Sequence, residues 1–269
     1  MQVAGLGYTN PRAQNVGFLK RYKDGNYKLV HMRSVRIPGF EERDPPERKR
    51  QSGRDAPKLE NSLARSRSAV WELALCNPWE WFVTLTLNPA KRDRYDLRTS
   101  YGQLSKFFNN YNSRTDAALK YLLIPEPHRD GAWHFHGLLS GLPPPHLRPF
   151  SLEDNIPARL KDMLRDGRQI FTWPAYAETF GFVTLERIRD PERCAAYITK
   201  YITKELGKSS IELNHHLYYC SKGLHRAELL YKGEMLRSFA DPDFENDYVR
   251  IKRFSDVSEA LSYFCDLEV

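Results

Sequence analysis

Cysteine is scarce in this sequence. The four cysteines lie far apart and form no Cys-x-x-Cys pair; they are Cys76, Cys194, Cys220 and Cys265. Closely spaced pairs are expected of a zinc knuckle, and a disulfide framework needs a denser set. The spacing therefore argues against both, and we expect reduced, structural thiols.

Long apolar runs are missing as well. No stretch approaches the ~20 apolar residues needed to cross a bilayer, although hydrophobic residues make up 41% of the chain. The polar N-terminus lacks the apolar core of a signal peptide. These absences predict a soluble, cytoplasmic protein that does not bind a membrane.

A phosphate-binding loop of the usual kind is absent too. Residues 206–210 read LGKSS, and Gly-Lys-Ser is how such a loop ends. The motif also needs a glycine five positions before Gly207, where this sequence has Ile202. We therefore expect no nucleotide cofactor and no helicase domain in the chain.

Positive charge is present but concentrated near the start. The formal net charge is +7, and residues 1–70 hold 15 Lys and Arg against 7 Asp and Glu. That segment therefore carries +8 and the remainder −1. A basic segment of this kind predicts salt-sensitive contact with a phosphate backbone, and a solvated basic extension is the alternative. The candidate contacts are Arg48, Lys49, Arg50 and Arg54.

The segment YITKYITK places two tyrosines and two lysines at helical spacing. Tyr197, Lys200, Tyr201 and Lys204 stand at positions i, i+3, i+4 and i+7. A helix that begins near Pro191 would bring all four to one face. Two phenols and two ammonium groups would then lie side by side.

Aromatic residues at this spacing more often pack in a core than take part in chemistry. Here a separate apolar stripe is available, because Cys194, Ile198, Ile202 and Leu206 repeat every four residues. The stripe can be buried while the Tyr/Lys face is left free to meet the edge of a sheet.

A second pattern, WHFHGLL, begins at Trp133. It alternates like a strand, so His134 and His136 point to the same side. Two histidines on a strand make a metal site plausible, and tyrosines on a neighbouring helix would supply nucleophiles. A tyrosine hydroxyl, with a pKa of about 10, attacks phosphorus poorly unless a metal activates the phosphate and cations stabilise the phenolate.

Strands and helices are mixed without a repeated parallel β-α-β rhythm. Residues 82–87, FVTLTL, alternate between apolar and threonine side chains, which fits a sheet with one face supporting a site. The other expected elements are a hairpin around Asp24-Gly25, helices at 61–76 and 96–112, paired strands at 121–124 and 134–139, and a strand at 182–188. The mixture predicts an α+β fold with a central antiparallel sheet of about five strands flanked by helices.

Composition also suggests the domain boundaries. Residues 38–57 are rich in charge, proline and glycine, which is typical of a linker or mobile loop. We expect a basic N-terminal extension with this linker at 1–60, one main domain at 61–232 and a C-terminal extension at 233–269. One main domain suits a chain of 269 residues.

The order of FVTLTL, HFH and YITKYITK resembles motifs I, II and III of the HUH endonucleases, specifically the two-tyrosine initiators of rolling-circle replication in single-stranded DNA phages and related elements. The resemblance covers roughly residues 62–232, and the tandem Tyr-x-x-Lys is its most specific part. It implies the HUH fold and metal-dependent nicking and rejoining of single-stranded DNA through a 5′-phosphotyrosine bond. It assigns Tyr197 and Tyr201 as nucleophiles, with Lys200 and Lys204 as their electrostatic partners.

The resemblance also places His134 and His136 on a central strand, where a divalent ion needs a third ligand. Glu126, on the preceding strand, is the expected one, and His128 is its competitor. A set of imidazole and carboxylate ligands suits Mn²⁺ or Mg²⁺, although zinc or nickel also binds imidazole pairs.

Whether Glu126 faces the histidines depends on the turn between the two strands. A loop of three residues, such as 129–131, pairs Glu126 with His134 and turns both to the same side. A two-residue turn at Asp130-Gly131 pairs Glu126 with Phe135 instead.

The implied substrate is an origin in single-stranded DNA, and a host helicase and polymerase are the expected partners. A transposase or a mobilisation relaxase would use the same chemistry. The alternative from another class is a non-catalytic module that stacks single-stranded DNA on aromatic and arginine side chains. Aromatic residues make up 13% of the chain, but stacking alone requires no metal ligands.

Overall fold

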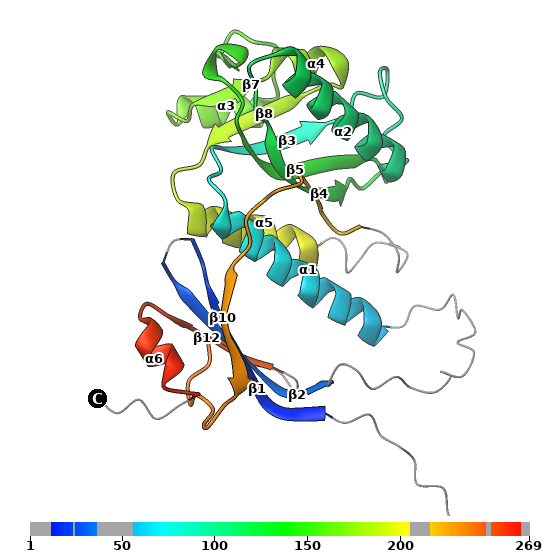
Figure 1. Ribbon diagram of the computed structural model, residues 1–269. Helices are drawn as coiled ribbons and strands as arrows, with labels where there is room; N and C mark the ends of the chain where they lie inside the picture. The colour runs from blue at the N-terminus through cyan, green and yellow to red at the C-terminus, as the bar shows by residue number, and fades with distance from the viewer. Residues whose placement is uncertain (1–11, 24, 37–55, 205–215, 246–248, 265–269) are drawn as a thin grey trace, which may run out of the picture. The chain divides into compact units, whose positions relative to one another are not determined.

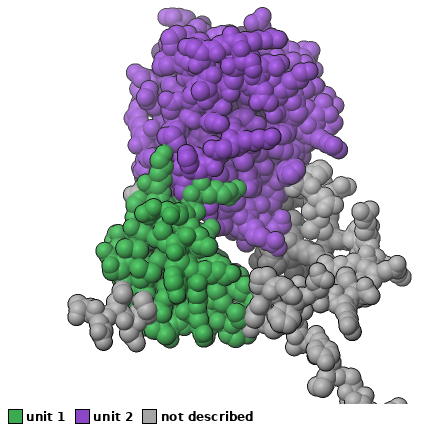
Figure 2. Space-filling model, viewed as in Figure 1, with its two compact units in different colours: residues 1–53, 226–269 green, residues 54–225 purple. Residues whose placement is uncertain are grey.

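The computed structural model (Figure 1) describes residues 12–23, 25–36, 56–204, 216–245 and 249–264. The chain divides into two compact units (Figure 2), one formed by residues 54–225 and the other by residues 1–53 together with 226–269. The candidate segment with Arg48, Lys49, Arg50 and Arg54 lies outside the described residues.

The second of these units contains a five-stranded antiparallel sheet in the order β10-β1-β2-β12-β11. Its strands are β1 (Arg12–Arg21), β2 (Tyr27–Arg36), β10 (Glu228–Glu234), β11 (Phe244–Glu245) and β12 (Val249–Phe254). Leu19, Leu29 and Phe254 from the sheet share a core with Ala260 of the short helix α6 (Val257–Leu261).

The hairpin expected around Asp24-Gly25 is confirmed as the β1–β2 pair. The backbone N–H of Tyr22 donates to the carbonyl of Asn26 over 2.8 Å. Gly25 has φ +85°, which is in the left-handed region that favours glycine.

The two ends of the chain meet in this one sheet. Strand β10 pairs along the length of β1, and β12 pairs with β2. The compact units divide the chain at residues 54 and 226, whereas composition suggested boundaries after residues 60 and 232. Pairing between strands some 200 residues apart leaves no trace in local composition, and this accounts for the difference.

The larger unit is built on a seven-stranded sheet in the order β6-β7-β8-β3-β5-β4-β9, and all of its strand pairs are antiparallel. The strands are β3 (Trp81–Thr86), β4 (Lys120–Pro127), β5 (Trp133–Ser140), β6 (Arg148–Pro149), β7 (Ile170–Thr172), β8 (Val183–Arg187) and β9 (Tyr219–Cys220). The α+β class with helices flanking antiparallel strands is confirmed, and this sheet is wider than the expected five strands.

One face of the larger sheet packs against an aromatic cluster. Helices α2 (Leu97–Arg114) and α4 (Pro174–Thr179) contribute Phe108 and Tyr176, which join Trp173 and Phe135 in the core. The opposite face packs against α1 (Ala56–Cys76) and α5 (Pro191–Lys204). There the buried apolar side chains are Val70, Leu73, Leu122, Ile124, Leu138, Ala195, Ile198 and Ile202.

The predicted elements of this unit are confirmed within a few residues. Asp96 caps α2, because its side chain accepts hydrogen bonds from the backbone N–H groups of Arg98 and Thr99. Pro191 stands at the start of α5, as expected for a residue without a backbone N–H.

The stretch after Leu142 was left unresolved by the sequence. It forms the short helix η1 (Pro144–His146), strands β6 and β7, and helix α3 (Ala158–Arg165). None of the helices in the described part of the chain is long and apolar enough to cross a membrane.

Candidate metal and tyrosine site

The β4–β5 hairpin decides the orientation of Glu126. The N–H of His128 donates to the carbonyl of Ala132 over 2.7 Å, so residues 129–131 form the loop, and Gly131 adopts φ +84°. The register therefore pairs Glu126 with His134 and turns both to the same face of the sheet. Of the two turns considered from the sequence, the structure has the three-residue loop.

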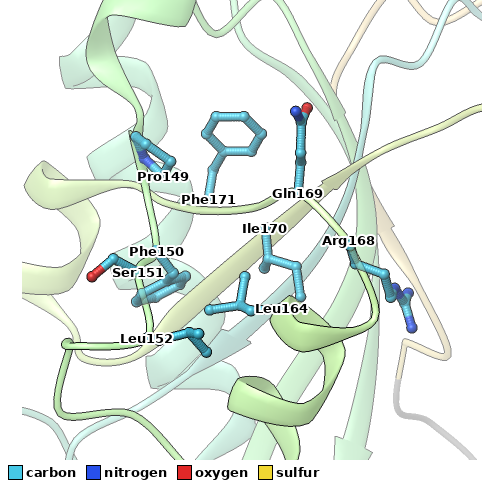
Figure 3. A pocket seen from close by; sticks show the side chains of 10 residues that line it. Pro149, Phe150, Ser151, Leu152, Leu164, Arg168, Gln169, Ile170 and Phe171 are labelled. Carbon is cyan, nitrogen blue, oxygen red and sulfur yellow. The ribbon is translucent and has the colours of Figure 1, made fainter.

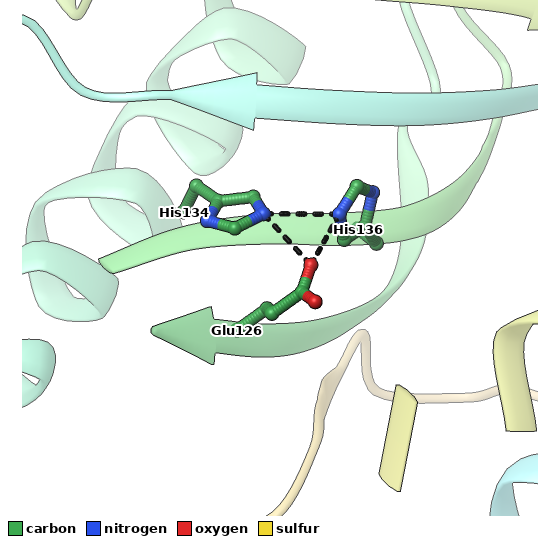
Figure 4. Close-up of side chains that lie close together, drawn as sticks. All are labelled: Glu126, His134 and His136. Carbon is green, nitrogen blue, oxygen red and sulfur yellow. Dashed lines mark hydrogen bonds and ion pairs between the residues drawn. The ribbon is translucent and has the colours of Figure 1, made fainter. Parts of the chain in front are cut away.

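Glu126, His134 and His136 converge on one point (Figure 4). Glu126 Oε2 lies 2.8 Å from His134 Nε2 and 2.7 Å from His136 Nε2, and the two Nε2 atoms are 3.0 Å apart. Neighbouring ligands of an octahedral ion with ~2.1 Å bonds lie about 3.0 Å apart. The spacing of the three atoms thus fits one divalent cation, and among the described residues this is the group of histidine, cysteine and carboxylate side chains close enough to hold one.

The surroundings of the two imidazoles differ. Thr84 on β3 lies opposite His136, and its Oγ1 is 3.1 Å from His136 Nδ1. A proton on Nδ1 can be donated to Thr84, which leaves the lone pair of Nε2 for a metal. The Nδ1 atom of His134 is buried and has no hydrogen-bond partner among the described residues.

The competing ligand His128 stacks flat on His134 instead of joining the cluster. The two ring centroids are 4.0 Å apart with an interplanar angle of 27°. Burial next to His134 lowers the pKa of His128. Its position is that of a cover over the His134 ring.

Helix α5 separates its apolar and polar faces as its sequence indicates. Ile198 and Ile202 are fully buried against the sheet, whereas Tyr197 is 48% exposed. Tyr201 is half-buried, and its ring stacks on His136 with centroids 4.1 Å apart. The helix therefore brings a phenol directly to the histidine cluster.

The two tyrosines are hydrogen-bonded to each other. The hydroxyl of Tyr201 donates to the hydroxyl of Tyr197 over 2.7 Å, and the Tyr197 ring packs edge-on against Phe82, with centroids 5.4 Å apart. Burial raises the pKa of Tyr201 above its ordinary value. The hydrogen bond to Tyr197 and the negative charge of Glu126 raise that pKa further, and the charge of Arg159 works against them.

The carboxyl group of Glu126 is ionised at neutral pH. Burial by itself raises its pKa, but the hydrogen bonds with His134 and His136 outweigh the burial and bring the pKa to about 2. An ionised carboxylate beside two imidazoles is a donor set that hard divalent cations accept.

A cleft of about 1010 Å³ surrounds this cluster and both tyrosines. Its walls are strongly basic, with Arg129, Arg159, Arg168, Arg187, Arg189 and Arg193 among the lining residues. Sequence reasoning did not single out these arginines. Three of them fall within the short run 187–193, RIRDPER, ahead of the tyrosines, and this charge density could have indicated them, whereas only the fold brings in Arg159.

The two lysines of the tandem motif are placed differently. Lys200 is exposed on α5 and does not line the cleft. Lys204 is the last residue of α5, and its side chain lies outside the described residues. Their expected electrostatic role stays a prediction, and Arg159 is the cation that acts on Tyr201.

Comparison with known proteins adds a family to this geometry. Residues 80–206 match the family model of the replication-associated protein ORF2/gene 2 protein. The matched segment spans just under half of the chain and includes the cluster, both tyrosines and Arg159. No curated protein and no solved structure matches the chain significantly. The match supports a family of rolling-circle replication initiators and a replication-associated function that involves DNA.

Proposed function

We propose that this chain is a metal-dependent endonuclease that nicks and rejoins single-stranded DNA at an origin and so initiates rolling-circle replication. The observation that carries the proposal is the stacking of Tyr201 on His136, because it brings the tyrosine pair to the Glu126, His134 and His136 cluster. The family match points to the same biological process.

The chemistry follows from the groups in the cleft. A tyrosine oxygen attacks the scissile phosphorus and loses its proton, an O–P bond forms, and the bond from phosphorus to the 3′ oxygen breaks. The 5′ end stays on the tyrosine, and the 3′ oxygen takes up a proton and leaves as a hydroxyl that a host polymerase can extend. The phosphotyrosine keeps the energy of the original bond, so rejoining needs no nucleotide cofactor.

Glu126, His134 and His136 are the residues that would hold the metal, with Mn²⁺ or Mg²⁺ as the proposed ion. Such an ion supplies a Lewis acid that polarises the phosphate and balances its charge. Thr84 orients His136, and the arginines of the cleft attract and hold the phosphate backbone.

Two tyrosines allow a closed cycle. While one carries the 5′ end, the other can cleave the regenerated origin and pass the strand back for joining. Only one phenol can occupy the in-line position at a time, and the hydrogen bond from Tyr201 to Tyr197 makes the two hydroxyls neighbours that can exchange this role. Strand separation would come from a host helicase.

The test is covalent capture of a single-stranded oligonucleotide that carries the origin of the element encoding this chain. We expect a gel-stable protein–DNA adduct with the wild-type protein and Mn²⁺, and none after chelation or in the Tyr197→Phe/Tyr201→Phe variant. Tyr95→Phe is the matched control, because Tyr95 is an exposed tyrosine outside the cleft.

The variant with both substitutions should still bind metal and DNA, since phenylalanine keeps the packing and removes only the two oxygens. An adduct formed by this variant would place the nucleophile elsewhere. DNA binding by the wild-type protein without any adduct would favour the non-catalytic binding module instead.

A further inference from the structure

A second hollow, of about 550 Å³, lies beside the tyrosine cleft (Figure 3). The side chains of Phe150, Leu152, Leu164 and Ile170 gather on one side of β7, as the figure shows, whereas Gln169 and Phe171 point the other way. Leu152 is exposed although it is apolar. The hollow therefore offers an open, apolar surface with an aromatic ring.

The hollow and the tyrosine cleft are continuous. Arg168 and Ile170 line both. Phe182 lines the cleft and is 38% exposed, and its ring lies 5.7 Å from that of Phe150 with an interplanar angle of 30°. A strand whose phosphate lies at the tyrosines therefore meets Phe182 and then Phe150 without leaving the protein surface.

The charges around the hollow are already compensated. Arg168 pairs with Glu186, and Arg148, whose guanidinium lies 5.8 Å from the centre of the Phe150 ring, pairs with Asp154 over 2.9 Å. A phosphate would have to compete with these carboxylates. A flat, uncharged group fits better, since it can stack on the ring and cover the leucines.

We propose that the hollow holds one nucleobase of the DNA strand, stacked on Phe150, while Phe182 contacts the neighbouring base nearer the scissile phosphate. The proposal rests on the proposed function, because it takes the strand from the tyrosine cleft. Stacking on aromatic side chains tolerates any base, so this subsite contributes affinity and sets the register of the strand without reading its sequence.

The first experiment measures equilibrium binding of the single-stranded origin oligonucleotide by fluorescence anisotropy. The full chain carries Tyr197→Phe/Tyr201→Phe, so that no covalent adduct interferes. Adding Phe150→Leu should weaken binding about 5- to 150-fold, the range expected for one lost stacking contact, whereas Phe150→Trp should bind about as tightly as the parent. Phe244→Ala is the control, because Phe244 is half exposed on β11, in the other unit.

The second experiment locates the base. Oligonucleotides with one abasic site at successive positions are bound to the parent and to the Phe150→Leu protein. At one position the abasic site should weaken binding to the parent and have little further effect on Phe150→Leu, because both changes remove the same contact. Additive losses at every position, or full affinity of Phe150→Leu, would overturn the proposal.

The two proposals fail in different ways. Covalent capture by the wild-type protein together with full affinity of Phe150→Leu would overturn the base subsite alone. Absence of any adduct together with a Phe150-dependent loss of affinity would overturn the nuclease and leave the subsite supported as part of a DNA-binding surface.

Discussion

The hydroxyl of Tyr201 donates a hydrogen bond of 2.7 Å to the hydroxyl of Tyr197, one helical turn earlier. The two phenols are therefore not equivalent. Tyr197 is half exposed to solvent and accepts the hydrogen bond, whereas Tyr201 is packed on His136 and gives up its proton less readily because its pKa is raised.

This asymmetry predicts unequal rates of covalent capture. Each unit by which a pKa is raised lowers the phenolate fraction at neutral pH tenfold. We therefore expect Tyr201→Phe, which retains Tyr197, to capture DNA at least about 10-fold faster than Tyr197→Phe. Single-turnover kinetics on the origin oligonucleotide measure both rates. Equal rates would contradict the asymmetry, and a complete loss in one variant with no change in the other would indicate a one-tyrosine enzyme.

The pH dependence should follow the same direction. In Tyr197→Phe the remaining nucleophile is the phenol with the raised pKa, so its phenolate fraction keeps growing up to and beyond the ordinary value of about 10. Capture by this variant should therefore rise across the whole neutral and alkaline range. A plateau below the ordinary tyrosine value would show that the ionisation of another group limits the rate.

The cluster of Glu126, His134 and His136 predicts a directly measurable metal site. Glu126→Ala should weaken Mn²⁺ binding roughly 10- to 1000-fold, which corresponds to about 1.4 to 4 kcal/mol for one ligand. His134→Ala/His136→Ala should abolish binding and nicking. Isothermal titration calorimetry with Mn²⁺ measures the affinity, and His128→Ala is the control. Strong loss in His128→Ala with none in Glu126→Ala would reverse the choice of third ligand.

Thr84 should support the metal through His136. Thr84→Val keeps the shape of the side chain and removes the oxygen that lies 3.1 Å from His136 Nδ1. Partners of this kind typically contribute 10- to 100-fold in metal affinity, so a loss of roughly 10-fold is expected. Thr86→Val is the matched control on the same strand face, since its hydroxyl bonds to no described residue. Equal affinities of the two variants would remove Thr84 from the site.

Gly137 controls how closely β4 and β5 approach each other. A Cβ at this position would lie 2.4 Å from Leu123 Cδ2 and 2.6 Å from the carbonyl oxygen of Leu122. Gly137→Ala should therefore lower the free energy of unfolding by about 1–3 kcal/mol. Gly102→Ala is the control, because nothing lies within 4 Å of its Cβ in α2, and it should be neutral or stabilising. Urea denaturation that gave the reverse order would refute this reading of the hairpin.

The basic segment near the N-terminus gives a prediction that depends on charge alone. Alanine at Arg48, Lys49, Arg50 and Arg54 should weaken binding of all single-stranded sequences about equally and flatten the dependence of affinity on salt. Affinities measured at several salt concentrations for origin and unrelated oligonucleotides provide the test. A change in origin preference at constant salt slope would contradict phosphate contact.

Local spacing alone determined a large part of the candidate site. Alternation along a strand turns His134 and His136 to one side whatever the rest of the fold does, and a helix brings Tyr197 and Tyr201 to one face in the same way. These relations follow from bond geometry within a few residues, so they could be read before any tertiary contact was known.

Other relations depend on contacts between distant residues, and only the tertiary structure decided them. Two turns were compatible with the sequence around Asp130-Gly131, and the pairing of Glu126 with His134 follows from the one that forms. The hollow at Phe150 and the approach of Arg159 to Tyr201 arise from a segment with no clear periodicity. The pairing of β1 with β10 joins opposite ends of the chain. The free energy of such contacts comes from burial and hydrogen bonding across the fold, which neighbouring residues in the sequence do not encode.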